Sequence, residues 1–172
     1  MLDVINETKT EVRGLLTGAA KTIRAVRYCW LVTKSADGFN ARPMGRVLPD
    51  ESEDGWTIRF VTDGRSRKAH ELCDEREVGL IFQFDPDEAY AALFGKARLL
   101  ERAEDVARLW KTHYEAYFPT AADRAAAAFI EVDVNRMELW IRGVTPEPFG
   151  LRPSVLERDA GGAWRISDHN AA

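Results

Sequence analysis

The segment from Trp56 to Leu72, WTIRFVTDGRSRKAHEL, constrains the fold most because it encodes a strand, a polar turn and a helix start in direct succession. Apolar residues alternate with polar ones up to Thr62, which is typical of a strand with one buried face. The turn behind this strand delivers Ser66, Arg67 and Lys68 together, and serine is a favoured residue at a helix N-cap. The segment therefore predicts a β-rich chain in which a helix starts directly after a strand.

The three residues at this turn carry chemistry that suits a phosphate. The Ser66 hydroxyl, the Arg67 guanidinium and the Lys68 ammonium lie beside the amides of a helix start, and each of these groups favours a dianion. A simpler interpretation stays open, in which Ser66 caps the helix and the two cations are solvated. No catalytic triad is implied. The acidic run that follows reads as the solvated end of the helix, and it contains Glu71, Asp74, Glu75 and Glu77.

Basic residues gather around this segment although the chain as a whole is acidic. The formal net charge is −4 and the isoelectric point is about 5.5. Because a basic face is needed to displace counterions from a polyanion, this charge argues against non-specific nucleic-acid binding. A local basic cluster suits a small anionic ligand better. The cluster consists of Arg42, Arg46, Arg59, Arg65, Arg67 and Lys68.

The composition is that of an ordinary soluble domain, since 45% of the 172 residues are hydrophobic and 30% are charged. We therefore expect one domain with one core. The first residues, MLDVINETKTEVRG, lack the basic start and the apolar run of a signal peptide. No stretch approaches the roughly 18 apolar residues of a membrane span. The expected location is the cytoplasm, with no membrane partner.

Cysteines and histidines indicate neither a disulfide framework nor a metal site. Cys29 and Cys73 lack paired spacing, and Cys29 lies in an apolar strand where a packed thiol is expected. The histidines, His70, His113 and His169, are scattered without the spacing of metal ligands. We expect no bound metal.

Hydrophobic periodicity predicts a mainly β fold with flanking helices. The expected helices cover residues 8–18, 66–73 and 103–116, with Asn6 or Thr8 as the first N-cap. The expected strands cover residues 22–33, 39–48, 56–62, 77–84, 88–101, 129–134 and 137–141. Gly95, inside the longest strand, is expected to mark a bulge or bend. Six to seven short strands with helical excursions describe an antiparallel β-barrel.

The pattern changes after Gly143. Three prolines interrupt a segment without periodicity, and a Gly-Gly pair precedes the isolated apolar residues Trp164 and Ile166. We expect residues 1–143 to form the barrel and residues 144–172 to form an ordered arm or lid of the same domain.

A series of motifs, in a fixed order, gives the chain a family resemblance. They are Arg42-Pro43-Met44 in a strand, an acidic hairpin from Pro49 to Gly55, W-x-I-x-F-x-T-D-x-x-S-R-K from Trp56 to Lys68, a G-x-A kink within Tyr90 to Leu99, Leu109-Trp110 followed by Tyr117-Phe118-Pro119, and an E-x-W hairpin from Val132 to Trp140. From about Thr8 to Trp140 the chain resembles the pyridoxamine 5′-phosphate oxidase-like proteins, and it is most similar to their bacterial general stress protein subgroup. These proteins are small FMN-binding split β-barrels.

The resemblance implies a homodimer that binds FMN in a groove between two barrels. The flavin phosphate would lie on the turn after the third strand, and the flavin ring would lie along the second strand. The implied cofactor contacts are Arg42, Pro43, Met44, Thr62, Asp63, Ser66, Arg67, Lys68, Tyr90 and, from the partner subunit, Trp140. Taken alone, Met44 would read as core packing. FAD, a deazaflavin or haem in the same barrel are the alternatives to FMN.

The chain departs from the oxidases of this family at two places. Tyr90 stands where they carry a polar amide, and their R-L-H-D-R segment is absent because Trp140 runs into Ile141-Arg142-Gly143. We therefore expect no efficient oxidation of pyridoxine or pyridoxamine phosphate. The expected function is that of a stress-related flavin redox protein, a small-molecule oxidoreductase. The alternative is a flavin-binding or flavin-sequestering protein without turnover, and the substrate, electron donor and catalytic residues stay undefined.

Overall fold

The computed structural model describes residues 2–47 and 56–167, except for the side chains of residues 2–7. Its helices are α1 (Leu2–Ala25), α2 (Arg67–Asp74), α3 (Ala103–Leu109) and α4 (Ala121–Ala125), with short 3-10 helices η1 (Asp85–Asp87) and η2 (Thr112–Ala116). Its strands are β1 (Tyr28–Ser35), β2 (Gly38–Val47), β3 (Thr57–Asp63), β4 (Glu77–Phe84), β5 (Ala89–Leu100), β6 (Ala127–Ile141), β7 (Ser154–Arg158) and β8 (Trp164–Ile166). β4 covers the predicted residues, and β3 and β5 begin and end within one residue of the prediction.

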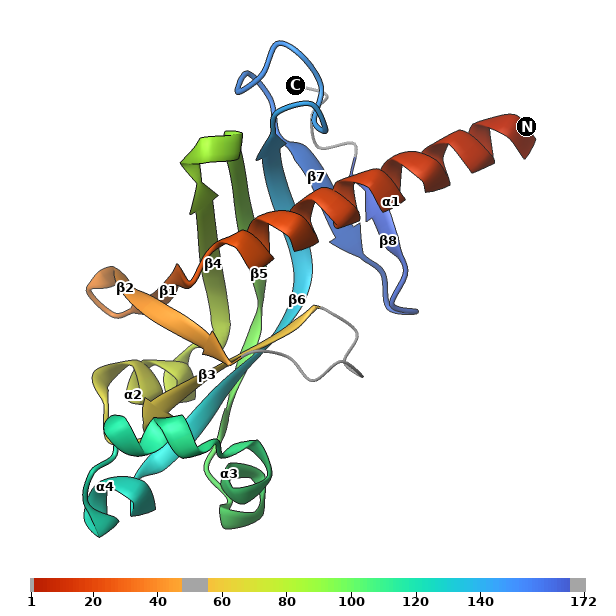
Figure 1. The fold of residues 1–172 in the computed structure, drawn as a ribbon. Helices are drawn as coiled ribbons and strands as arrows, with labels where there is room; N and C mark the ends of the chain where they lie inside the picture. The colour runs from red at the N-terminus through yellow and green to blue at the C-terminus, as the bar shows by residue number, and fades with distance from the viewer. Residues whose placement is uncertain (1, 48–55, 168–172) are drawn as a thin grey trace. The chain divides into compact units, whose positions relative to one another are not determined.

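The strands form one sheet in the order β3-β2-β1-β4-β5-β6-β7-β8 (Figure 1). An additional antiparallel pairing of β3 with β6 closes the first six strands into a barrel, with Thr57 opposite Asp133 and Asp63 opposite Ala127. β7 pairs with β6, and β8 pairs with β7, both antiparallel. The closed ring confirms the prediction of a mainly β chain built on an antiparallel barrel with flanking helices.

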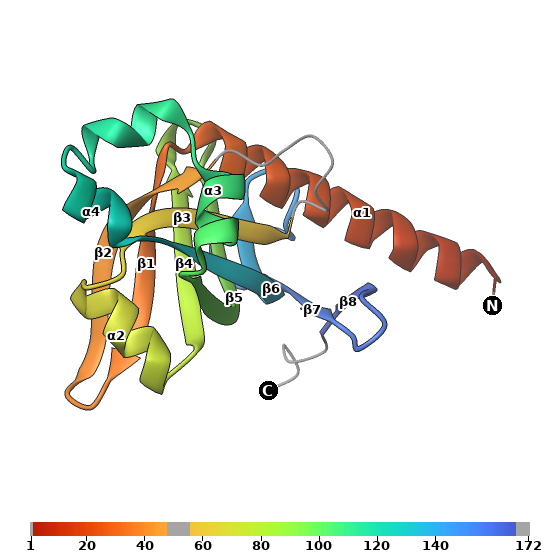
Figure 2. The ribbon, with the colours of Figure 1, turned by 90° about the horizontal axis from the view of Figure 1, so that it is seen from below.

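The chain is organised as two compact units that share the long strands. The first contains Met1–Cys29, Leu80–Phe94 and Asn135–Ala172, and the second contains Trp30–Gly79 and Gly95–Val134. The second unit holds β2, β3 and the helices α2 to α4, and Figure 2 shows α2 next to the hairpin of β1 and β2. It therefore carries most of the residues that the sequence marked as a site.

An aromatic cluster forms part of the core of this second unit. The ring of Trp110 lies 5.8 Å from that of Tyr114 and 5.7 Å from that of Phe118, and Tyr114 lies 5.9 Å from Phe129. The predicted helix 103–116 is wrong at this point, because α3 ends at Leu109 and Trp110 takes an extended conformation before η2 begins. The interruption follows from the packing of the Trp110 ring against this cluster.

The first helix is longer than predicted at both ends. It begins at Leu2, so the expectation that Asn6 or Thr8 is its N-cap is wrong. It continues through Gly18 to Ala25, and β1 begins only at Tyr28. Gly18 does not end the helix, because it is a packing position: a methyl group there would lie 3.1 Å from a side-chain carbon of Val144 and 3.2 Å from one of Ile141. The buried hydroxyl of Thr22 donates to the Gly18 carbonyl at 3.0 Å, within the extended part of the helix.

The end of the chain also differs from the prediction. The two expected strands 129–134 and 137–141 are one strand, β6, and the segment interpreted as lacking periodicity contains β7 and β8. Gly95 is a point of close approach, since a methyl group there would lie 2.2 Å from the backbone oxygen of Asp133. The acidic hairpin 49–55, the Asn6 side chain and His169 lie outside the described residues. Within those residues, no helix combines the length and apolar character that a membrane span requires.

Candidate functional site

The turn between β3 and α2 has the geometry of a helix start with free amides. The Ser66 amide donates to the Asp63 carbonyl at 3.0 Å, and Ser66 occupies the N-cap position in an extended conformation. Its hydroxyl makes no capping hydrogen bond and lies 3.4 Å from the Thr62 hydroxyl instead, so the simple capping interpretation is wrong. Helix geometry leaves the first-turn amides of Arg67 and Lys68 without an intrahelical acceptor.

Asp63 shapes this turn through Arg65. Its carboxylate accepts hydrogen bonds from the Arg65 amide at 2.8 Å, from Nε at 2.9 Å and from Nη2 at 2.6 Å. Arg65 also reaches Asp123 at 3.3 Å, and Asp123 forms a capping box with Thr120 at the start of α4. The hydrogen bond from Arg65 holds the pKa of Asp63 below its ordinary value, although burial opposes it. The turn is thus tied to a neighbouring helix.

Lys68 is the unusual cation of this site. Its side chain is half-buried, and within the described part of the chain no hydrogen bond or ion pair reaches its ammonium group. Burial is the main reason that the pKa of Lys68 is lowered, and the positive charge of Arg42 lowers it further, while Asp63 and Glu71 oppose both effects. A buried cation in these surroundings is stabilised by an anionic ligand.

Arg42 belongs to a buried network centred on Glu71. The Glu71 carboxylate accepts hydrogen bonds from Thr33 at 2.5 Å, from Asn40 at 2.7 Å and from Arg42 at 2.8 Å. Arg67 approaches it at 3.3 Å, and Arg42 also donates to the Thr33 hydroxyl at 2.5 Å. Burial by itself raises the pKa of Glu71, but the hydrogen bonds from Thr33 and Arg42 and the nearby guanidinium charges outweigh it and lower the pKa.

Glu71 therefore corrects the interpretation of the acidic run as a solvated helix end. Its side chain is 7% exposed, whereas Asp74 and Glu77 are exposed as expected. The sequence missed Thr33, Asn40 and Glu71 as members of the site. The available signals were the helical i,i+4 spacing of Arg67 and Glu71 and the alternation that places Asn40 and Arg42 on one face of β2.

The other residues predicted to contact the cofactor differ in burial and in the compact unit to which they belong. Thr62 and Met44 are buried, and Pro43 is exposed on β2. Tyr90 and Trp140 belong to the first compact unit, where each is half-buried. The ring of Tyr90 lies 6.5 Å from that of Phe149, and burial, aided by Asp85, raises its pKa. The second unit thus brings together Arg42, Thr62, Asp63, Ser66, Arg67 and Lys68.

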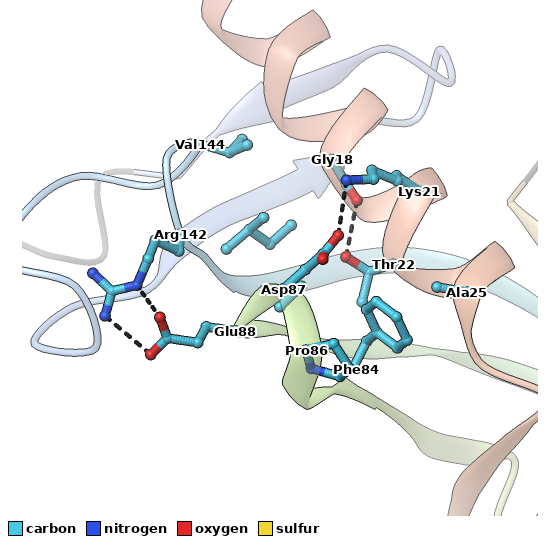
Figure 3. A pocket seen from close by; sticks show the side chains of 12 residues that line it. Gly18, Lys21, Thr22, Ala25, Phe84, Pro86, Asp87, Glu88, Arg142 and Val144 are labelled. Carbon is cyan, nitrogen blue, oxygen red and sulfur yellow. Dashed lines mark hydrogen bonds and ion pairs between the residues drawn. The ribbon is translucent and has the colours of Figure 1, made fainter.

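A cavity of about 390 Å³ lies in the first unit (Figure 3). Its walls come from the second half of α1, the turn between β4 and β5, and the end of β6. Lys21 pairs with Asp87 at 2.8 Å, and Arg142 pairs with Glu88, with one contact of 3.0 Å. Lys21 and Arg142 therefore both have carboxylate partners at the cavity, and their charges are balanced. The Lys68 ammonium has no such partner among the described residues. In residues 2–47 and 56–167, no His, Cys, Asp and Glu side chains form a group that would hold a metal ion.

The closed antiparallel barrel with flanking helices defines the class of split β-barrel proteins. The chain belongs to the pyridoxamine 5′-phosphate oxidase like family, whose sequence model matches residues 17–145. This finding confirms the resemblance drawn from the motifs.

Individual relatives share the fold at low sequence identity. The chain is 26% identical over 140 residues to a pyridoxine/pyridoxamine 5′-phosphate oxidase of Shewanella denitrificans, a match that covers 75% of this chain and 66%, just under two thirds, of the oxidase. A structure from Clostridium acetobutylicum, related to general stress protein 26, has a TM-score of 0.68 and 17% identity, covering 85% of this chain and 95% of that one. An FMN-binding, pyridoxamine 5′-phosphate oxidase-related protein of Nostoc punctiforme has a TM-score of 0.63 and 15% identity, covering 96% and 94%.

Proposed function

We propose that this protein binds FMN, with the flavin phosphate at the turn between β3 and α2, and that it acts as a small flavin-dependent redox protein. The observation that carries the proposal is the half-buried Lys68 ammonium, which has no counter-ion among the described residues and lies at a helix start beside Arg42. The general stress protein 26 relatives and the FMN-binding neighbour support the same assignment.

The residues at the turn fit a phosphate monoester. Two hydroxyl groups, those of Thr62 and Ser66, lie 3.4 Å apart, and the first-turn amides of α2 are available as donors. Lys68 would supply a charge at the phosphate, and Arg67 a second one from the rim, because its side chain is 73% exposed. A bound flavin supplies electron transfer, and the chain's own residues bind it and orient it.

Titration of the flavin-free protein with FMN and with riboflavin tests the phosphate assignment. FMN should bind more tightly, because riboflavin lacks the phosphate. Lys68→Ala should cost about 2 kcal/mol or more of FMN binding and leave riboflavin binding unchanged, since it removes a partly desolvated charge. Arg67→Ala should cost less, about 0.5–1 kcal/mol, because its charge is exposed. Arg98→Ala is the matched control, since Arg98 is also exposed and also pairs with a buried glutamate. Equal affinities for FMN and riboflavin would refute the assignment.

Three further measurements separate the proposed function and cofactor from their alternatives. Rapid anaerobic bleaching of the bound flavin by NADH or NADPH supports a redox protein, whereas a flavin that stays oxidised indicates a carrier or a sequestering protein. The visible spectrum of the purified protein distinguishes an oxidised flavin from a deazaflavin or haem. Mass determination of the released cofactor distinguishes FMN from FAD.

A further inference from the structure

We infer that Glu71 is an internal counter-anion of the phosphate site, which holds Arg42 and Arg67 in the free protein and thereby weakens the binding of a phosphate ligand. The inference rests on the proposed function and adds to it a residue that limits affinity. It concerns the second compact unit alone, because Glu71 and its partners all belong to that unit.

The contacts of Glu71 divide the two arginines into a fixed one and a movable one. Arg42 is 17% exposed, and it bonds both the Glu71 carboxylate and the Thr33 hydroxyl. Thr33 in turn donates to the same carboxylate, so the guanidinium of Arg42 is held by a closed set of hydrogen bonds. Arg67 is 73% exposed and makes a single contact of 3.3 Å to Glu71. Arg67 is therefore the arginine that a ligand can recruit.

Glu71 lowers the positive charge that the turn offers to a dianion. Arg42, Arg67 and Lys68 contribute three positive charges, and Glu71 offsets one of them. Arg65 does not add to this count, because Asp63 and Asp123 bind it. A phosphate on Lys68 has to compete with Glu71 for Arg67 and is repelled by the carboxylate. Both effects lower its affinity.

Glu71→Gln tests the inference against a closely matched control. Glutamine keeps the size of the side chain and one acceptor oxygen but removes the negative charge. In the same unit, Glu131 is also 7% exposed by its side chain, and it accepts hydrogen bonds of 2.6 Å from Arg59 and from Arg98. Glu131→Gln therefore removes an equally buried, doubly arginine-bonded carboxylate that has no hydrogen bond or ion pair with α2 in the described structure. FMN and riboflavin are titrated into the full-length wild-type protein and both variants.

The expected result is a gain of about tenfold in FMN affinity for Glu71→Gln, with unchanged riboflavin affinity. Glu131→Gln should change neither affinity. An FMN affinity of Glu71→Gln equal to or below that of the wild type overturns the inference while leaving the proposed function intact. A wild-type protein that does not distinguish FMN from riboflavin refutes the proposed function itself, and the inference with it.

A second measurement does not depend on the folding of a variant. In a crystal structure of the wild-type protein with FMN, the Arg67 guanidinium should have left Glu71 for the phosphate, while Arg42 keeps its bonds to Glu71 and Thr33. An intact contact between Arg67 and Glu71 beside a bound phosphate would contradict the inference.

Discussion

At the scale of single residues, Lys68 differs from Arg65 and Arg142 in the groups that surround it. Arg65 bonds two carboxylates, and Arg142 bonds Glu88 and lies with its guanidinium carbon 4.3 Å from the centre of the Phe149 ring. Lys68 has only longer-range attraction to Asp63 and Glu71 to offset its burial and the repulsion of Arg42. Its charge is therefore available to a ligand, and its protonation should respond to one.

Binding of FMN should be linked to protonation of Lys68. Burial and Arg42 lower the pKa of Lys68 in the free protein, and a bound phosphate favours the ammonium form and raises that pKa. FMN binding at alkaline pH should therefore take up a proton, and FMN affinity should fall as pH rises through the lowered pKa. In the same window, between the lowered pKa and the ordinary lysine value, the unfolded chain binds more protons, so the ligand-free protein gains stability as pH rises.

Calorimetry in buffers of different ionisation enthalpy measures this proton uptake. The observed heat should depend on the buffer for the wild-type protein, and this dependence should disappear in Lys68→Met. Identical heats in all buffers across the alkaline range would show that Lys68 does not change its protonation on binding.

At the scale of secondary-structure elements, the sequence was most informative where local periodicity decides the structure. β4 places Val78, Leu80 and Phe82 on one buried face, and it was predicted to the residue. Ser66, Arg67 and Lys68 could be placed together because they are neighbours in the chain. The extension of α1 through Gly18 could not be predicted, because it depends on packing against Ile141 and Val144, far away in sequence. Glu71 was missed for the same reason: its partners Thr33, Asn40 and Arg42 are 38, 31 and 29 residues away.

Gly95→Ala should destabilise the barrel at the crossing of β5 and β6. A methyl group at this position would meet the Asp133 carbonyl oxygen at 2.2 Å and the Val134 Cα at 2.9 Å, and both are backbone atoms of a strand that also pairs with β3. Such overpacking costs about 1–3 kcal/mol, or more where the backbone cannot yield. Urea unfolding measures the free-energy change.

Gly14→Ala is the control, because Gly14 lies exposed on α1 with nothing within 4 Å, and alanine should stabilise that helix by up to about 1 kcal/mol. Similar effects of the two substitutions would contradict the steric argument.

At the scale of the whole molecule, we propose that the protein is a homodimer. Among the large aromatic residues of the second unit, Phe60 is fully buried and Trp110 packs in the aromatic cluster, so neither is available for an interface. In the second unit, however, Trp30 is 51% exposed and Phe39 is 78% exposed, on the adjacent strands β1 and β2. Large exposed aromatic side chains of this kind mark interaction surfaces.

Sedimentation velocity at micromolar concentration should show a dimer for the wild-type protein and a shift to monomer for Trp30→Lys. Tyr117→Lys is the control, because Tyr117 is also an exposed aromatic residue but follows η2 and is not part of β1 or β2. A wild-type monomer that retains flavin would rule out a site built from two chains.

We also expect the protein to be a poor oxidase of pyridoxine and pyridoxamine phosphate. A phosphorylated substrate needs a second anion site above the flavin. Arg142, the first cation after Trp140, is bound to Glu88 and packed over Phe149, so it does not offer a free charge. An assay of pyridoxal phosphate formation with the FMN-loaded protein measures this, with the Shewanella denitrificans oxidase as the positive control. Turnover on the order of one per second would contradict the expectation.

The convergence of three hydrogen-bond donors on the Glu71 carboxylate has an evolutionary consequence. Loss of any one of Thr33, Asn40 or Arg42 leaves a buried polar group without its partner, at a cost of about 1–3 kcal/mol. A marginally stable domain tolerates few such changes in succession. Substitutions at these positions and at Glu71 should therefore arise together across the lineages of this family, whereas the exposed Arg67 is less constrained by this network because it approaches Glu71 only at 3.3 Å. Coordinated substitution at residues 33, 40, 42 and 71 in aligned sequences of the family would be evidence of this network.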